Sequence, residues 1–145
     1  MSKETFDSIF TQVGKAKTKK EKIDILRANS GPVMKAILGY TYDPNVVWLL
    51  PEGVPPYKAL DENSDAGVTL QSEMKRFYLF VDGPTDTQKN MKQARREELF
   101  IQTLESLRPE DAKVLLGMKD RKLPYRGLTR KLVAEAFPNL AANWF

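Results

Sequence analysis

The sequence has 145 residues, 41% of them apolar, which is enough for one domain with a single buried core. Without a run of 18 apolar residues or the apolar stretch of a signal peptide, neither a membrane protein nor a secreted protein is expected. The chain contains no His and no Cys. This excludes the commonest general base, the usual zinc ligands, and the Ser-His and Cys-His nucleophile pairs.

The formal net charge is +4, but the positive charge is concentrated in two segments. Residues 15–22 carry five Lys and one Glu, and residues 113–131 carry seven Lys or Arg and one Asp. The rest of the chain therefore has 11 basic and 17 acidic groups, a net charge of −6. If the two segments lie close together in the fold, they form a patch suited to phosphate groups. The alternative is a solvated helix end and a charged loop.

Three short helices are predicted in the first third of the chain. The first ends at Gly14, the second begins at the capping box that starts with Thr18, and the third opens with Pro32. Helical spacing places on their buried faces Phe6, Ile9, Phe10, Val13, Ile23, Leu26, Val33, Met34, Ile37 and Leu38.

Residues 43–68 contain four prolines, which exclude a long helix, yet they are too apolar for a free linker. We expect an ordered, extended loop that lies on the helices, with a candidate strand only near residues 46–50. A fourth helix carries an apolar stripe of Leu70, Met74, Phe77, Tyr78 and Val81, and Asp82-Gly83-Pro84 ends it.

The longest helix is predicted to start at a second capping box, Thr85 to Gln88, and to bury Phe100, Ile101, Leu104 and Leu107. Two more helices follow. Their predicted buried residues are Val114, Leu115 and Met118 after Pro109, and Leu128, Leu132, Val133, Ala136 and Phe137 before Pro138. The predicted fold is therefore all-α, a compact bundle of about six or seven short helices over residues 1–145.

The order and spacing of several segments resemble the N-terminal DNA-binding domain of phage-type ATP-dependent DNA ligases. The likeness covers nearly the whole chain, although one residue is inserted between Leu123 and Gly127 relative to the ligase pattern. The segments that carry it are residues 20–29, Met34-Lys35, Tyr40-Thr41-Tyr42, residues 110–115, Leu123, Gly127 and Phe137-Pro138-Asn139-Leu140.

This resemblance implies a domain that grips duplex DNA, intact or nicked, across the minor groove, mainly through phosphates and with little base specificity. It does not imply ligation. The ligase nucleophile is the Lys of a Lys-x-Asp-Gly motif, and the nearest stretch here is Phe80-Val81-Asp82-Gly83, with Phe in place of Lys. A non-enzyme without cofactors is therefore expected. The chain is also similar, at residues 49–57, to small proteins of large tailed phages, which implies a bacterial host cytoplasm.

The best candidate for a phosphate site lies between Lys119 and Lys131, around a predicted helix start at Gly127-Leu128-Thr129. Thr129 can either cap that helix or bond a phosphate oxygen, and Gly127 either permits close backbone approach or only makes a turn. The lysines of the second helix start repeat the pattern. The candidate DNA-binding residues are Lys15, Lys17, Lys19, Lys20, Lys119, Arg121, Lys122, Arg126, Gly127, Thr129, Arg130 and Lys131.

Two further features carry weaker signals. Residues 61–67 suggest a calcium loop only faintly, because Ala66 and Ser72 stand where that loop needs Gly and a bidentate carboxylate, so no metal site is expected. The tail, residues 141–145, ends in Trp144 and Phe145. We expect both aromatics to pack back on the domain. The alternative function is a protein-interaction module whose tail docks in a phage or host protein, such as a sliding clamp.

Overall fold

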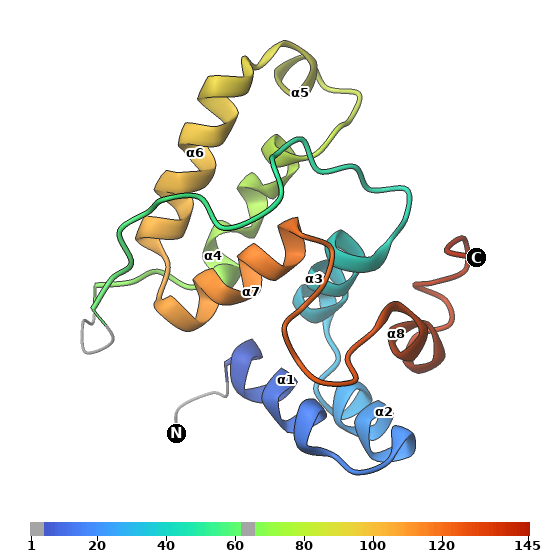
Figure 1. Ribbon diagram of the computed structural model, residues 1–145. Coiled ribbons are helices and arrows are strands. Elements are labelled where there is room, and N and C mark those ends of the chain that lie inside the picture. Colours follow the sequence, from blue (N-terminus) through green and yellow to red (C-terminus); the bar gives the residue numbers. More distant parts are fainter. Residues whose placement is uncertain (1–4, 62–65) are drawn as a thin grey trace.

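The computed structural model describes residues 5–61 and 66–145 and is all-α, as predicted (Figure 1). The described residues form no strand, and isolated β-bridges join Trp48 to Val81 and Val68 to Leu107. The helices are α1 (Phe6–Lys15), α2 (Lys19–Ala28), α3 (Pro32–Tyr42), α4 (Leu70–Glu73), the 3-10 helix η1 (Met74–Phe80), α5 (Asp86–Asn90), α6 (Gln93–Ser106), α7 (Pro109–Lys119) and α8 (Arg130–Ala136).

The helices are arranged around α3 and α7, which pack against each other in the middle of the molecule (Figure 1). α1 packs against α2 and α7, and α2 packs against α8, so α1, α2 and α8 form one end. α5 and the first half of α6 lie at the other end. The second and the last helix of the chain are therefore neighbours in space.

Capping contacts confirm most of the predicted helix starts. Thr18, Thr85 and Thr129 each accept a hydrogen bond from the backbone amide of the third residue of the helix that follows. Such a bond satisfies one of the amide donors that a helix start leaves unpaired. Pro32 and Pro109 stand at the first positions of α3 and α7, where no amide donor is needed.

Two predicted helices differ from the structure. The segment from Leu70 to Val81 forms one α-helical turn, α4, and then continues as η1. Tyr78, which was expected on the buried stripe, is exposed, because a 3-10 helix has three residues per turn instead of 3.6. The long helix predicted from Thr85 is broken at Met91, which has an extended backbone, into α5 and α6.

Polar side chains from neighbouring segments account for both differences. In a continuous helix the Gln88 carbonyl would accept from the amide four residues later, but here it accepts from the buried Arg96 guanidinium at 2.6 Å. Arg96 also donates to the Leu79 carbonyl at 3.0 Å. The Gln88 side chain donates to the Tyr78 carbonyl at 2.9 Å. These side chains supply the donors that regular α-helix would otherwise provide at the end of η1 and between α5 and α6.

The Pro-rich loop, taken here as residues 43–61, is ordered and crosses the helices, as predicted (Figure 1). Side-chain contacts help to fix its first half. The Trp48 indole donates to the Tyr40 carbonyl at 2.8 Å, and the Gln93 amide donates to the Leu49 carbonyl at 2.8 Å. The predicted loop therefore belongs to the folded structure.

The buried Lys119 side chain, only 4% exposed, anchors the middle of the loop. Its ammonium group donates to the carbonyls of Pro51 and Gly53, both at 2.8 Å, and forms an ion pair with the Asp120 carboxylate. All three ammonium hydrogens thus have acceptors, which is the condition for burying this charge.

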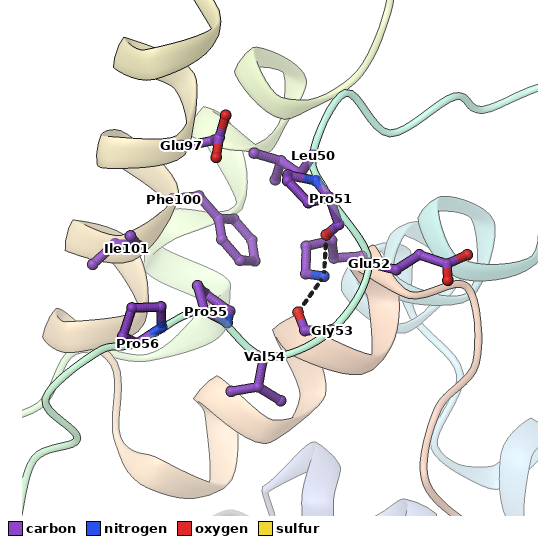
Figure 2. A pocket seen from close by; sticks show the side chains of 11 residues that line it. Leu50, Pro51, Glu52, Gly53, Val54, Pro55, Pro56, Glu97, Phe100 and Ile101 are labelled. Atoms are coloured by element: carbon purple, nitrogen blue, oxygen red, sulfur yellow. Dashed lines mark hydrogen bonds between the residues drawn. The ribbon is translucent and has the colours of Figure 1, made fainter.

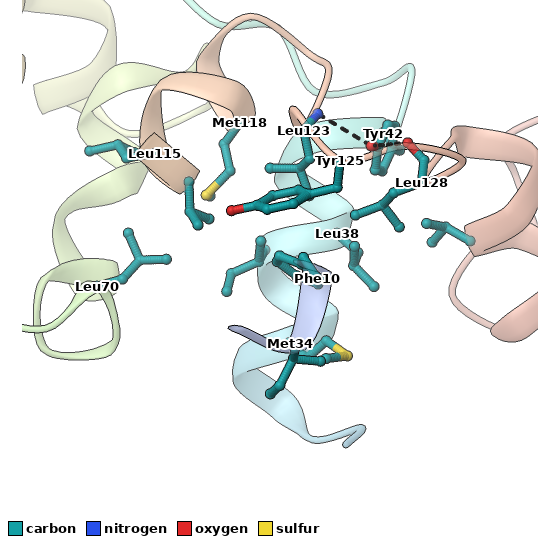
Figure 3. Close-up of a cluster of buried hydrophobic side chains, with 14 of the residues drawn as sticks. Phe10, Met34, Leu38, Tyr42, Leu70, Leu115, Met118, Leu123, Tyr125 and Leu128 are labelled. Carbon is teal, nitrogen blue, oxygen red and sulfur yellow. Dashed lines mark hydrogen bonds between the residues drawn. The ribbon is translucent and has the colours of Figure 1, made fainter. Parts of the chain in front are cut away.

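One cluster of buried apolar side chains joins all parts of the described structure (Figure 3). In Figure 3 the Tyr125 ring lies beside Leu38 of α3, Phe10 of α1 and Met118 of α7. The cluster also takes in Phe77, Phe80 and Phe100 from the α6 end, so the two ends share one core.

Replacing Lys119 by Met should lower the free energy of unfolding by about 2 to 4 kcal/mol, because two loop carbonyls and one carboxylate lose their donor. Lys122→Met is the matched control. Lys122 is exposed, and its side chain forms no hydrogen bond or ion pair with a described residue, so a change within about 0.5 kcal/mol is expected. Urea unfolding of both variants measures the difference, and equal effects would contradict the anchoring role.

Candidate nucleic-acid interface

The two basic segments of the sequence meet at one corner of the fold, where α1 leads into α2 and where the chain enters α8 (Figure 1). Lys19 of α2 forms an ion pair with Glu135 of α8 at 3.1 Å, across a separation of 116 positions. Gly14 lies against the backbone of Arg126, since a Cβ atom on Gly14 would be 3.3 Å from the Arg126 amide nitrogen. Residues 15–22 and 126–131 therefore converge in the fold, which is the condition for a patch suited to phosphate groups.

Six exposed cations surround this junction and are called the basic corner. Lys19 and Lys20 form ion pairs with Glu135 and Asp24, and such exposed pairs contribute little and exchange easily. The other four form no ion pair or hydrogen bond through their side chains with the described residues. The basic corner consists of Lys15, Lys17, Lys19, Lys20, Arg126 and Lys131.

The half-buried Lys22 holds the two sides of the corner in place. Its ammonium group donates to the carbonyls of Val13 and Ala16 at 2.7 and 2.9 Å, which satisfies acceptors at the end of α1. The side chain passes over Gly127, whose φ is +75°, and a Cβ atom there would be 2.9 Å from Lys22 Cε. Glycine at this position thus permits both the turn and the close packing.

A second set of contacts holds the segment between α7 and α8 against α1. The Tyr125 hydroxyl donates to the Asp7 carboxylate at 2.7 Å, and the Lys113 ammonium group lies 3.2 Å from the same oxygen. Burial raises the pKa of Tyr125, and the hydrogen bond to Asp7 raises it further, so the phenol remains a donor at neutral pH. Arg126 follows directly and is thereby held beside α1.

A hollow of about 250 Å³ lies within the corner, between α2 and the start of α8. Thr129 at its edge accepts a hydrogen bond from the Leu132 amide at 3.2 Å, so it caps α8. Glu135 reduces the positive charge of the hollow. Glu135 stands four residues after Lys131, so the sequence alone could have shown that the two side chains share one face of the helix. The residues that line the hollow are Lys19, Lys22, Gly127, Thr129, Lys131, Leu132 and Glu135.

Two predicted DNA contacts are wrong, because the protein itself uses these side chains. Lys119 is buried beneath the Pro-rich loop, as described above. The Arg121 guanidinium donates to the carbonyls of Asp43 and Val46, just after α3. Burial lowers the pKa of Arg121, and the neighbouring Arg130 lowers it further. Neither cation is available to a phosphate group.

Two further candidates lie outside the basic corner. Lys122 is exposed, but it lines a separate hollow beside Tyr57 and Lys113. The half-buried Arg130 donates through Nε to the Tyr42 carbonyl at 2.8 Å, and this bond connects the start of α8 to the end of α3. The segment from Lys119 to Lys131 is thus divided between several environments.

The two aromatics of the tail have different environments. Trp144 is 6% exposed and belongs to the core cluster, as expected, whereas Phe145 is 85% exposed. The expectation that both pack on the domain is therefore correct for Trp144 and wrong for Phe145. Removing Trp144 would remove a buried side chain, so Phe145 alone is open to a partner.

The described residues, 5–61 and 66–145, also bear on metal and membrane sites. Within these ranges no three Asp or Glu side chains are grouped so that they could hold a metal ion. The weak calcium-loop pattern at 61–67 lies largely outside the described residues. No helix in the described part of the chain is long and apolar enough to cross a bilayer.

Lys22→Met should lower the free energy of unfolding by about 1 to 2 kcal/mol, because the end of α1 loses two hydrogen bonds. Lys20→Met, on the same helix, removes only an exposed ion pair and should change stability by about 0.5 kcal/mol or less. Chemical unfolding monitored by circular dichroism compares the two variants. A larger loss from Lys20→Met would contradict the assigned roles.

The comparison with protein families gives one match. The profile of a family of unknown function, DUF6433, matches residues 9–125, from α1 to Tyr125. The matched region includes the α1–α2 side of the basic corner and ends one residue before Arg126. No curated protein matches the sequence. Because the profile covers most of the chain, the protein belongs to the family of unknown function DUF6433.

Proposed function

We propose that this protein binds double-stranded DNA, intact or nicked, through the phosphate backbone at the basic corner, and that it has no catalytic activity. The observation that carries the proposal is the convergence of two basic segments from opposite ends of the sequence at one surface. The bridging side chain of Lys22 and the contact between Tyr125 and Asp7 hold this arrangement rigidly. A prearranged set of cations reduces the entropy lost on binding.

The charge of the corner supports a backbone contact more than base recognition. Five of its six cations are lysines, which act as point charges and lack the planar fork with which arginine reads guanine. Lysines of this kind neutralise phosphates and release counterions without distinguishing sequences. The resemblance to ligase DNA-binding domains supports the same mode of binding.

The proposal of a non-catalytic role has separate support. The sequence lacks His and Cys, and its closest stretch to the ligase nucleophile motif has Phe80 where that motif needs lysine. The proposed setting is the cytoplasm of a bacterial host, in keeping with the likeness to proteins of large tailed phages.

Fluorescence anisotropy with a labelled duplex should show binding whose affinity falls steeply with salt. Four to six phosphate contacts would give a slope of log Kd against log salt of about 3.5 to 5.5. Intact, nicked and single-stranded probes of equal length identify the preferred substrate. The absence of duplex binding at low salt, or an affinity independent of salt, would contradict the proposal.

Replacing cations of the basic corner by Glu tests whether DNA binds at this surface. The triple variant Lys17→Glu, Arg126→Glu, Lys131→Glu should weaken duplex binding about tenfold or more. The control variant, Lys75→Glu, Lys89→Glu, Lys92→Glu, changes the net charge equally at exposed positions outside the corner. It should retain most of the affinity. Equal losses in the two variants would show that net charge alone determines binding and that the corner is not the site.

A second candidate function is a protein-interaction module, which the 85% exposure of Phe145 favours. A free aromatic of this kind can enter a hydrophobic groove on a phage or host protein, such as a sliding clamp. Phe145→Ala removes this contact without touching the buried Trp144. Unchanged binding of this variant to a purified clamp would exclude the tail.

A further inference from the structure

A second surface feature lies between the Pro-rich loop and α6, outside the basic corner (Figure 2). The loop and the helix enclose a hollow of about 240 Å³. Sites for small molecules usually measure about 300 to 1,000 Å³, so this hollow is better suited to one side chain of a partner. In Figure 2 the Phe100 ring lies between α6 and the loop. The central lining residues are Pro51, Val54, Pro55, Glu97, Phe100 and Ile101.

The hollow is held open by contacts on both sides. The Lys119 ammonium group donates to the carbonyls of Pro51 and Gly53, and dashed lines in Figure 2 mark these two bonds. The Gly53 amide donates to Asp120 at 3.2 Å, and the Lys58 amide donates to Glu105 at 2.8 Å. Since prolines also stiffen this part of the loop, a ligand would find the site already formed and would lose little affinity to ordering it.

The wall of the hollow is apolar and its rim is acidic. Phe100 forms the buried floor, and Val54 is 68% exposed at the edge. Glu97, half-buried on α6, forms no hydrogen bond or ion pair with the described residues. A carboxylate partly removed from water beside apolar groups is favourably placed to receive a cation.

The charges around the hollow add up to a negative surface. Glu52 stands on the loop side, and Glu105 continues the acidic face of α6 beyond Glu97. The nearby cations do not cancel this charge, because Lys119 is neutralised by Asp120 and Arg95 is paired with Glu98. Lys58 is the exposed cation on the loop beyond the hollow. Outside the two basic segments the chain has a net charge of −6, so this acidic surface contrasts with the basic corner.

We propose that this hollow is a docking site for a basic segment of a partner protein. The segment inserts an apolar side chain between Pro55 and Phe100 and places a neighbouring Lys or Arg on Glu97. Charge complementarity identifies the partner as basic, and the apolar floor supplies the buried anchor that protein interfaces use. The site is separate from the basic corner, so DNA and the partner can bind at the same time, and neither proposal depends on the other.

The test uses the full-length, isotope-labelled protein and two short synthetic peptides. One peptide alternates Leu with Arg, and the other alternates Leu with Glu. The Leu-Arg peptide should produce saturable amide shifts confined to residues 49–57 and 97–101, and the Leu-Glu peptide should produce none. Glu97→Gln and Val54→Ser should each weaken binding of the Leu-Arg peptide about 5- to 10-fold. Asp82→Asn, an exposed carboxylate away from the hollow, is the control and should leave the affinity unchanged.

Thermal melts of each variant verify folding before the comparison. Shifts that map to another surface, equal binding of both peptides, or an affinity insensitive to Glu97→Gln would overturn the proposal. Sedimentation equilibrium tests whether a second copy of this chain occupies the hollow instead. Self-association that Glu97→Gln abolishes would assign the hollow to a second copy of this chain and would also overturn the proposal.

Discussion

Hydrogen bonds from cationic side chains to backbone carbonyls connect the parts of this fold. Short helices and a long irregular loop leave many carbonyls without an amide donor, and such groups must be paired when they are shielded from water. A Lys or Arg side chain meets this need because it carries several donors on a long stem. The residues that donate in this way are Lys22, Arg27, Arg96, Lys119, Arg121 and Arg130.

This use of cations explains which parts of the fold the sequence could predict. Helix starts were predictable, because Thr18, Thr85, Pro32 and Pro109 act on residues within one turn. The 3-10 helix and the break between α5 and α6 were not. They depend on Arg96, whose guanidinium reaches carbonyls 8 and 17 positions away. Hydrophobic periodicity contains no information about such contacts.

The candidate site was predictable from the sequence only in part, because contacts between distant residues also decide which of its cations are exposed. Charge counting identified two basic segments but left open whether they converge, and the packing of α2 against α8 brings them together. It could not separate the free Arg126 and Lys131 from Lys119 and Arg121, because all four are basic residues in one segment. The hollow beside Glu97 was also beyond prediction. The loop was recognisable from its prolines and the helix from its periodicity, but the sequence did not show that the two face each other.

We propose that the cations left free by the fold form the surface that binds DNA. Chemical-shift mapping of the isotope-labelled protein with a short duplex examines this surface, because it reports on backbone amides throughout the chain. We expect shifts concentrated in residues 14–20 and 126–132, which disappear at high salt. Shifts centred instead on η1 and α5, or spread evenly over all exposed lysines, would contradict it.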